Sequence, residues 1–133
     1  MATTDEHAQR VARYRRGRWS EWIAAAALMA RGYRVLVRRC RTPYGEIDLI
    51  AVRGRRLAFV EVKRRTTRAE GQAAITPRQA QRIARAAEFW ISRHPALRDY
   101  ERGLDAMLVT PGRLPQYLPD ALHMAPSGPR NWR

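Results

Sequence analysis

The sequence predicts an α/β fold, in which one mixed β-sheet is flanked by helices in the element order αβββαβ. Three observations lead to this prediction. The length of 133 residues suits one hydrophobic core rather than two. Two segments carry apolar residues at intervals of three and four, as packed helices do. Elsewhere, short runs rich in β-branched residues are separated by turn-forming pairs, as strands are.

The first helix is expected at residues 18–31, where Gly32 ends the pattern. Its predicted buried stripe consists of Trp19, Trp22, Ile23, Ala26, Ala27 and Ala30. At this spacing we interpret the two tryptophans as core residues rather than as platforms for stacking on bases. Glu21 lies opposite much of this stripe, so the helical pattern alone would make it an exposed charge.

Three strands are predicted next, at residues 33–40, 46–52 and 56–64. The turn sequence TPYG separates the first two, and the pair Arg53-Gly54 separates the second from the third. Connections this short join neighbouring antiparallel strands. The three strands are therefore expected to form an antiparallel meander.

The second helix has a clear beginning in the sequence. Thr76 is a suitable N-cap, Pro77 suits the first helical position, and Gln79 stands where a capping box places its second member. The helix is expected to continue to about Arg93, where His94-Pro95 ends it. The residues predicted to face inward are Ile83, Ala86, Ala87 and Trp90.

A fourth strand is predicted at residues 104–110, and residues 113–118 are expected to add a short edge. Residues 66–74 have the composition of a loop. The predicted organisation is a flexible basic N-terminus (1–15), one α/β domain (16–122) and a disordered tail (123–133).

The charge of the chain predicts a polyanionic partner. The sequence has 26 Lys and Arg residues against 12 Asp and Glu residues, a formal net charge of +14. Nucleic acid is favoured over membrane, because no apolar run approaches the roughly 18 to 20 residues of a spanning helix. The first ten residues lack the order of a secretion signal, so we expect a cytoplasmic protein. With Cys40 as its single cysteine, the chain cannot form an internal disulfide. The sequence also has no cysteine–histidine cluster with the spacing of zinc ligands, so structural zinc is not expected.

The stretch FVEVKRR (residues 59–65) contains Lys63, the only lysine among those 26 basic residues, so the other 25 are arginines. A lysine can release its proton near neutral pH when its surroundings lower its pKa, whereas an arginine cannot. A solvated surface charge could equally have been arginine. The lone lysine therefore points to a chemical role at this position.

Alternation along a strand places Glu61 and Lys63 on the same face. On the preceding strand, Glu46, Asp48 and Ile50 are expected to share a face, with Ile47, Leu49 and Ala51 opposite. If the two strands are neighbours, Asp48 and Glu61 can converge, although the sequence leaves their register open. Two carboxylates and the Val62 carbonyl would suit Mg²⁺. The competing interpretation is a solvated strand face with an ion pair worth at most about 1 kcal/mol.

The segments GEIDLIA (residues 45–51) and FVEVKRR together resemble the signature of the YraN-type family, small bacterial proteins with a restriction-endonuclease-like fold related to that of Holliday-junction resolvases. The resemblance covers roughly residues 16–109, including SEWIAAAALMARGYRVL and TPRQAQRIARAAEFW. It implies that Asp48, Glu61 and Lys63 correspond to a D…E-x-K nuclease motif, and that Glu21 completes the metal site. Arg39 and Cys40 stand where the family leads us to expect an asparagine and often an aromatic residue.

Three functions compete at this stage. The first is a Mg²⁺-dependent or Mn²⁺-dependent endonuclease acting on DNA, above all on branched or structured forms. Its catalytic residues would be Asp48, Glu61 and Lys63, and its metal ligands Glu21, Asp48, Glu61 and Val62. The second is a non-catalytic nucleic-acid-binding protein that keeps the nuclease fold. The third, an RNA-associated basic protein, leaves the acidic residues unexplained. Analogy with the fold adds a homodimer as an expectation.

Overall fold

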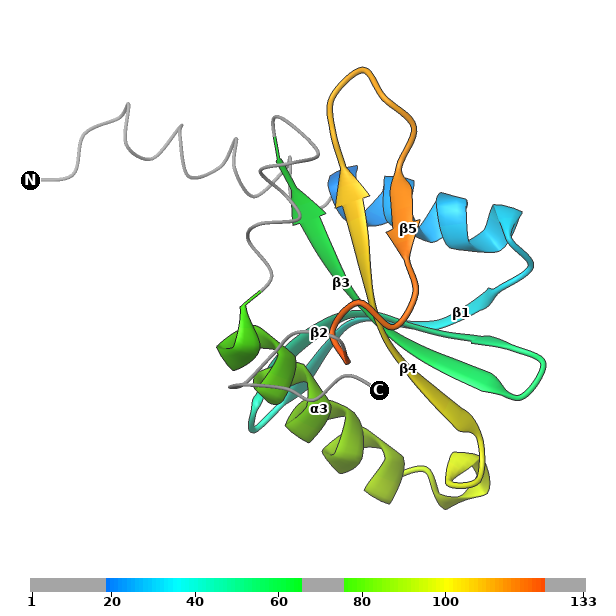
Figure 1. The fold of residues 1–133 in the computed structure, drawn as a ribbon. Coiled ribbons are helices and arrows are strands. Elements are labelled where there is room, and N and C mark those ends of the chain that lie inside the picture. The colour runs from blue at the N-terminus through cyan, green and yellow to red at the C-terminus, as the bar shows by residue number, and fades with distance from the viewer. Residues whose placement is uncertain (1–18, 66–75, 124–133) are drawn as a thin grey trace, which may run out of the picture.

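The computed structural model describes residues 19–65 and 76–123 (Figure 1). The described elements are a helix at residues 19–30, β1 (Arg34–Thr42), β2 (Gly45–Arg53), β3 (Arg56–Arg64), α3 (Pro77–Ser92), the 3₁₀ helix η1 (Pro95–Leu97), β4 (Glu101–Val109) and β5 (Gln116–Leu118). The predicted N-terminal segment, the predicted loop at residues 66–74 and all but His123 of the predicted tail lie outside the described residues.

The five strands form one sheet in the order β1-β2-β3-β4-β5. The pairs β1–β2, β2–β3 and β4–β5 are antiparallel, and β3–β4 is parallel. The parallel pair follows from the connection, because α3 carries the chain back across the sheet before β4 begins. The predicted antiparallel meander, mixed sheet and αβββαβ order are confirmed, and the fold is the restriction-endonuclease-like α/β core.

The sheet lies between two helices, one on each face (Figure 1). On one face, α3 packs through Ile83 and Trp90 against a core that includes Ile47 and Phe59. On the other face, helix 19–30 packs against a core that includes Val60. Among residues 19–65 and 76–123, no helix has the length and apolar character needed to cross a membrane.

Helix 19–30 buries a different face from the one predicted. Trp19 and Trp22 are 68% and 48% exposed, so the expectation that both lie in the core is wrong. The residues that this helix buries are Ser20, Glu21, Ala24, Ala25 and Leu28. Because residues 24–27 are all alanines, the apolar pattern fits more than one buried face. The face that packs on the sheet is the one without the two tryptophans. This orientation turns Glu21 inward.

Helix α3 begins as its sequence predicts. The Thr76 hydroxyl accepts a hydrogen bond from the backbone N–H of Gln79, and the Gln79 side chain accepts one from the backbone N–H of Thr76. These reciprocal bonds satisfy two donors that a helix start leaves without partners. The predicted inward residues, including Ile83 and Trp90, are buried. The cap and the buried stripe together hold α3 across its face of the sheet.

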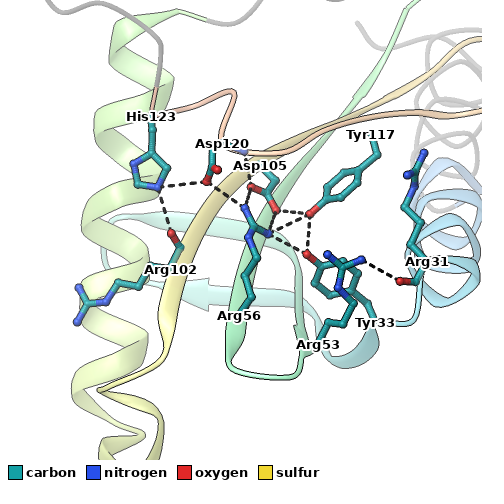
Figure 2. Close-up of polar contacts among 9 residues, drawn as sticks. All are labelled: Arg31, Tyr33, Arg53, Arg56, Arg102, Asp105, Tyr117, Asp120 and His123. Atoms are coloured by element: carbon teal, nitrogen blue, oxygen red, sulfur yellow. Dashed lines mark hydrogen bonds and ion pairs between the residues drawn. The ribbon is translucent and has the colours of Figure 1, made fainter. Parts of the chain in front are cut away.

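A buried polar network surrounds Asp105, which is fully buried on β4 (Figure 2). Arg56 donates two hydrogen bonds to its carboxylate, at 2.8 and 2.9 Å, and the Tyr117 hydroxyl and the backbone N–H of Asp120 donate two more. Arg56 also donates to the Tyr33 hydroxyl at 2.9 Å. The bond with Asp105 raises the pKa of Arg56, and burial raises that of Tyr117. The network ties β3, β4 and β5 together.

Candidate functional site

The candidate site forms where β2 and β3 separate. Their pairing reaches Leu49–Val60 and stops, although β2 begins at Gly45 and β3 continues to Arg64. The backbone N–H of Val62 therefore has no ladder partner on β2, and Asp48 Oδ2 accepts it at 2.8 Å. Because N–H and C=O of an extended residue point to the same side, the Val62 carbonyl is directed toward Asp48 as well. The gap between the strands thus exposes polar backbone beside a carboxylate.

An irregularity in the neighbouring strand accompanies Asp48. Arg39 on β1 has a φ of 56° and falls opposite Asp48, between the pairs Arg38–Leu49 and Cys40–Ile47. Only a minority of residues other than glycine adopt this conformation, and asparagine does so more readily than arginine. This offers a physical reason for the asparagine that the family resemblance led us to expect at position 39.

The alternation of β2 breaks at the same place. Ile47 and Ile50 both belong to the core that faces α3, whereas Leu49 belongs to the core on the other face. The prediction that Ile47 and Ile50 point to opposite faces is therefore wrong. Asp48 lies at the break, so simple alternation could not give the direction of its side chain.

Three carboxylates meet beside this break. Glu21 from helix 19–30 and Glu46 and Asp48 from β2 each place one oxygen so that the three lie within 4.8 Å of one another. We call these residues the carboxylate cluster. Glu21 is only 7% exposed, and Arg39 Nε donates to its Oε1 at 2.6 Å. The prediction that Glu21 approaches Asp48 agrees with this placement, whereas Glu46 was noted in the sequence without being assigned as a ligand.

Crowding of like charges changes the titration of Asp48. The pKa of Asp48 is raised to about 7, mainly by burial and in addition by repulsion from Glu61, Glu21 and Glu46. The hydrogen bond from the Val62 N–H acts in the opposite direction. Near neutral pH the Asp48 carboxyl is thus divided between its protonated and ionised forms. A bound divalent cation would offset both the repulsion and the cost of burying this charge.

Glu61 and Lys63 lie beside the carboxylate cluster on β3 and are 9% and 8% exposed. This burial rules out the alternative of a solvated strand face. Lys63 Nζ lies 3.4 Å from Glu61 Oε2, and Arg82 Nη2 on α3 donates to both Glu61 oxygens at 3.2 Å. The Glu61 carboxylate is therefore held between two cations, yet close enough to Asp48 to raise its pKa.

Arg82 is a site residue that the sequence did not single out. Its Nη1 donates to the backbone carbonyl of Glu46 at 3.0 Å, while its Nη2 holds Glu61. Gly45 has a φ of 123°, and a Cβ there would lie 2.6 Å from Arg82 Nη1. The only signal in the sequence was the basic character of the second helix. Contacts between α3 and two strands give Arg82 its role, and these arise only on folding.

The residues present fit a hard divalent cation. Carboxylate and carbonyl oxygens are the ligands that Mg²⁺ and Mn²⁺ prefer, and the carboxylate cluster with the Val62 carbonyl offers such a set. Glu61 can join when its ion pair with Arg82 opens. Of the predicted ligands, Glu21 and Asp48 meet, with Glu46 as a third carboxylate. Val62 bonds Asp48 through its N–H, and Glu61 lies nearby in its ion pairs with Lys63 and Arg82.

Residues 20–109 match the sequence pattern of the uncharacterised protein family UPF0102. The chain belongs to this family. The match runs from helix 19–30 through β4 and so includes every residue of the candidate site. It also confirms the predicted YraN-type resemblance.

Close relatives cover most of the chain. A UPF0102 protein of Rhodopseudomonas palustris (strain BisB5) is 52% identical over 118 residues, which are 89% of this chain and 90% of that protein. A UPF0102 protein of Bradyrhizobium diazoefficiens is 49% identical over 83% of each chain. One of Maricaulis maris is 53% identical over 77% of this chain and 80% of its own. UPF0102 membership thus assigns the chain to a family described by its sequence rather than by a reaction.

Proposed function

We propose that this protein is a Mg²⁺-dependent or Mn²⁺-dependent endonuclease that hydrolyses phosphodiester bonds in DNA, with branched or otherwise structured DNA as its substrate. The observation that carries the proposal is the gathering of buried and partly buried acidic residues and one buried lysine where β2 and β3 separate. Carboxylates at 4.8 Å or less from one another, of which Glu21 is buried and Glu46 and Asp48 are partly buried, destabilise a fold unless they have a cationic partner. Such an arrangement is expected at functional sites.

The carboxylates would hold the cation. Asp48, Glu21 and Glu46 already present oxygens to one point, and Glu61 lies beside them. A bound divalent cation would polarise a phosphoryl oxygen and lower the pKa of a coordinated water. The polar backbone of Val62 fixes Asp48 through its N–H, so the carboxylate is held before any substrate arrives.

We assign to Lys63 the role of positioning or deprotonating the attacking water. Its ammonium is buried and lies 3.4 Å from Glu61 Oε2, so the two side chains share one compartment. As the ammonium, Lys63 can orient the attacking water and balance negative charge developing on the phosphate. After losing its proton to solvent, the neutral amine can take a proton from that water. Arginine could supply only the charge, because its pKa is too high for proton transfer.

The charge of the whole chain supports DNA as the partner. A net charge of +14 attracts a polyanion, and the acidic site lies within a largely basic chain. Chromosomal DNA as substrate would place the activity in the cytoplasm. If about five phosphates are neutralised, log K for binding should fall against log salt with a slope of about −4 to −5. Affinity that does not change with salt would contradict a polyanionic ligand.

One observation favours a second function, a non-catalytic nucleic-acid-binding protein. Arg82 and Lys63 both engage the Glu61 carboxylate, and Arg82 reaches both of its oxygens. If this ion pair stays closed when DNA binds, Glu61 cannot serve as a ligand. The fold and the basic surface would then bind nucleic acid without hydrolysing it.

Cleavage assays distinguish the two functions. Purified protein is incubated with linear, nicked and four-way DNA in the presence of Mg²⁺, Mn²⁺ or chelator. Cleavage of at least one DNA with metal, and of none with chelator, is expected. Asp48→Asn and Glu61→Gln should abolish it, whereas the exposed Asp99→Asn is the matched control and should cleave normally. Binding should persist in all variants, because removing negative charge does not weaken attraction to phosphate.

Two results would contradict the endonuclease. Wild-type protein that binds all three DNAs without cleaving any would favour the non-catalytic function. Calorimetric Mn²⁺ binding that is unchanged in both Asp48→Asn and Glu61→Gln would show that these carboxylates do not hold the cation.

A further inference from the structure

A groove along α3 leads away from the candidate site. It consists of two adjoining hollows of about 560 Å³ and 210 Å³, both lined by Tyr44 and Arg85. Tyr44 lies in the turn between β1 and β2, and the opposite wall is the outer face of α3. The smaller hollow is also lined by Arg82, which bonds Glu61. We call this surface the Tyr44 groove, and it is continuous with the candidate site through Arg82.

The α3 wall of the groove carries a stripe of arginines. Arg78, Arg82 and Arg85 follow one another at intervals of four and three, so they lie on one face of the helix. Glu88 is the only acidic residue of α3, and its carboxylate forms an ion pair with Arg102. Glu88 is thus neutralised by Arg102 and Arg82 is paired with Glu61, so Arg78 and Arg85 are the groove arginines considered for binding a ligand. A ligand with regularly spaced negative charges complements such a stripe.

Tyr44 gives the groove an aromatic surface. The residue is 47% exposed, and its ring meets that of Phe89 with centroids 6.4 Å apart and a steep interplanar angle of 64°. In such a pair at least one face of each ring remains uncovered by the other. The guanidinium of Arg93 lies 4.8 Å above the Phe89 ring. Tyr44 thus remains as the ring with room for a further stacking partner.

These observations point to a ligand with both phosphates and a free base face. In a duplex, the faces of the bases are covered by their neighbours, and only their edges are accessible. An aromatic side chain can stack on a base in a single-stranded or unstacked segment. The larger hollow, at about 560 Å³, is in the range of sites that hold a small organic ligand.

We propose that the Tyr44 groove binds an unpaired DNA strand, with one base stacked on Tyr44 and the backbone phosphates against Arg78 and Arg85. The inference rests on the proposed function for the identity of the ligand as DNA, and it deepens that function. A duplex with a single-stranded flank would bind with the flank in the groove. The junction between duplex and flank would then lie toward Arg82 and the carboxylate cluster.

The test measures binding by fluorescence anisotropy, in chelator, so that neither metal nor cleavage contributes. Two labelled probes are compared, a blunt DNA duplex and the same duplex with a single-stranded overhang. Wild-type protein is expected to bind the overhang probe about tenfold more tightly, as one base-stacking contact implies. Tyr44→Ala should remove this preference and leave blunt-duplex affinity unchanged, whereas Tyr44→Phe, which keeps the ring, should retain it.

Arginine variants separate the groove from general charge. Arg85→Ala should reduce the salt slope of overhang binding by about 0.7, the value for one phosphate contact to a single strand. The exposed Arg98, at the end of η1, provides the matched control with the same loss of charge. Arg98→Ala should leave the preference for the overhang intact. Thermal melts of all variants establish that each is folded.

Several results would overturn the inference. Equal binding of both probes by wild-type protein is one, and equal weakening of both by Tyr44→Ala is another. Tighter binding of an RNA overhang than of a DNA overhang would be a third. The outcome is independent of the endonuclease, because a protein that never cleaves can still show the overhang preference in chelator, and a nuclease can cleave without it.

Discussion

Acidic side chains are buried or partly buried in two regions of the protein, and the two regions differ in the partners that surround these side chains. Around Asp105, a fully buried carboxylate receives two hydrogen bonds from Arg56, one from the Tyr117 hydroxyl and one from a backbone N–H (Figure 2). Around Asp48, three carboxylate oxygens crowd within 4.8 Å, and the Asp48 side chain receives one backbone hydrogen bond.

The difference separates structural from functional burial. A buried charge with a complete set of partners stabilises a single arrangement of the surrounding strands. At Asp48, burial first and the neighbouring like charges second raise the cost of ionisation, which explains its pKa of about 7. Groups whose pKa is shifted at an unfavourable free energy of this kind are found above all at catalytic and binding sites. We therefore assign the Asp105 network to the fold and propose a functional role for the carboxylate cluster.

The largest expected effect is on the stability that the Asp105 network provides. Asp105→Asn removes the negative charge and leaves Arg56 with Asp120, whose side chain is 55% exposed, as its charged partner. The free energy of unfolding in urea should fall by about 3 kcal/mol, as for other broken buried ion pairs. Mn²⁺ binding by the folded variant should stay unchanged. A loss below about 1 kcal/mol would mean that the network contributes little to the fold.

The next effect concerns Lys63 and catalysis. Lys63→Arg retains the charge and should lower DNA cleavage by at least about a hundredfold, because a guanidinium cannot take a proton from water. Cleavage time courses are compared with thermal melts and DNA titrations at the same salt concentration. Since Lys63 is buried, Lys63→Met is a second variant that adds no bulk and no charge. Wild-type cleavage rates in the arginine variant would remove Lys63 from the mechanism.

A smaller effect links pH to stability through Asp48. Its folded-state pKa is raised from 3.8 to about 7, so the folded protein holds this proton more tightly than the unfolded chain. Stability from this group is therefore present at low pH and is lost as pH rises between about 4 and 7. Asp48→Asn, which keeps an oxygen for the Val62 N–H, should gain several degrees in Tm over wild type at about pH 8 and little near pH 4.

The measurement is a series of thermal melts in chelator across that pH range. Adding Mn²⁺ at about pH 8 should raise the Tm of wild-type protein and have much less effect on Asp48→Asn, because a ligand stabilises the state that binds it. A constant difference in Tm at every pH would show that Asp48 does not titrate in this window.

The smallest effect is expected at an exposed ion pair beside the carboxylate cluster. Arg41 Nε lies 4.0 Å from Glu46 Oε2, and the Arg41 side chain is 91% exposed. Arg41→Ala should change the free energy of unfolding by no more than about 0.5 kcal/mol in urea titrations. A larger loss would indicate that the carboxylate cluster depends on Arg41 for charge balance. The cluster would then resemble the Asp105 network, in which an arginine neutralises the carboxylate.

The sequence predicted those features that depend on neighbours along the chain. The capping box of Thr76 and Gln79 involves residues three apart, and the helix that follows begins where the sequence predicts. The short connections between the first three strands require an antiparallel meander, which the structure has. The placement of Glu61 and Lys63 on one strand face also follows from a spacing of two.

Sequence reasoning was less successful where several arrangements satisfy the same local pattern. Alanines around helix 19–30 permit more than one buried face, and the predicted face with Trp19 and Trp22 was wrong. The prediction that side chains alternate regularly along β2 was wrong at Asp48. Arg39, which lies opposite on β1, has a left-handed backbone conformation at the same place. The local sequence of β2 does not predict the backbone conformation of a residue on β1.

By itself, then, the sequence determined the order of the elements, the family and the residue types available for chemistry. Tertiary structure alone decided which charges became partners. Asp105 and Arg56 are 49 positions apart, and Arg82 and Glu61 are 21 apart. The physical reason is that a local pattern reports on the conformation of a few residues, whereas the ionisation and bonding of a buried charge depend on every group that packing brings within a few ångströms.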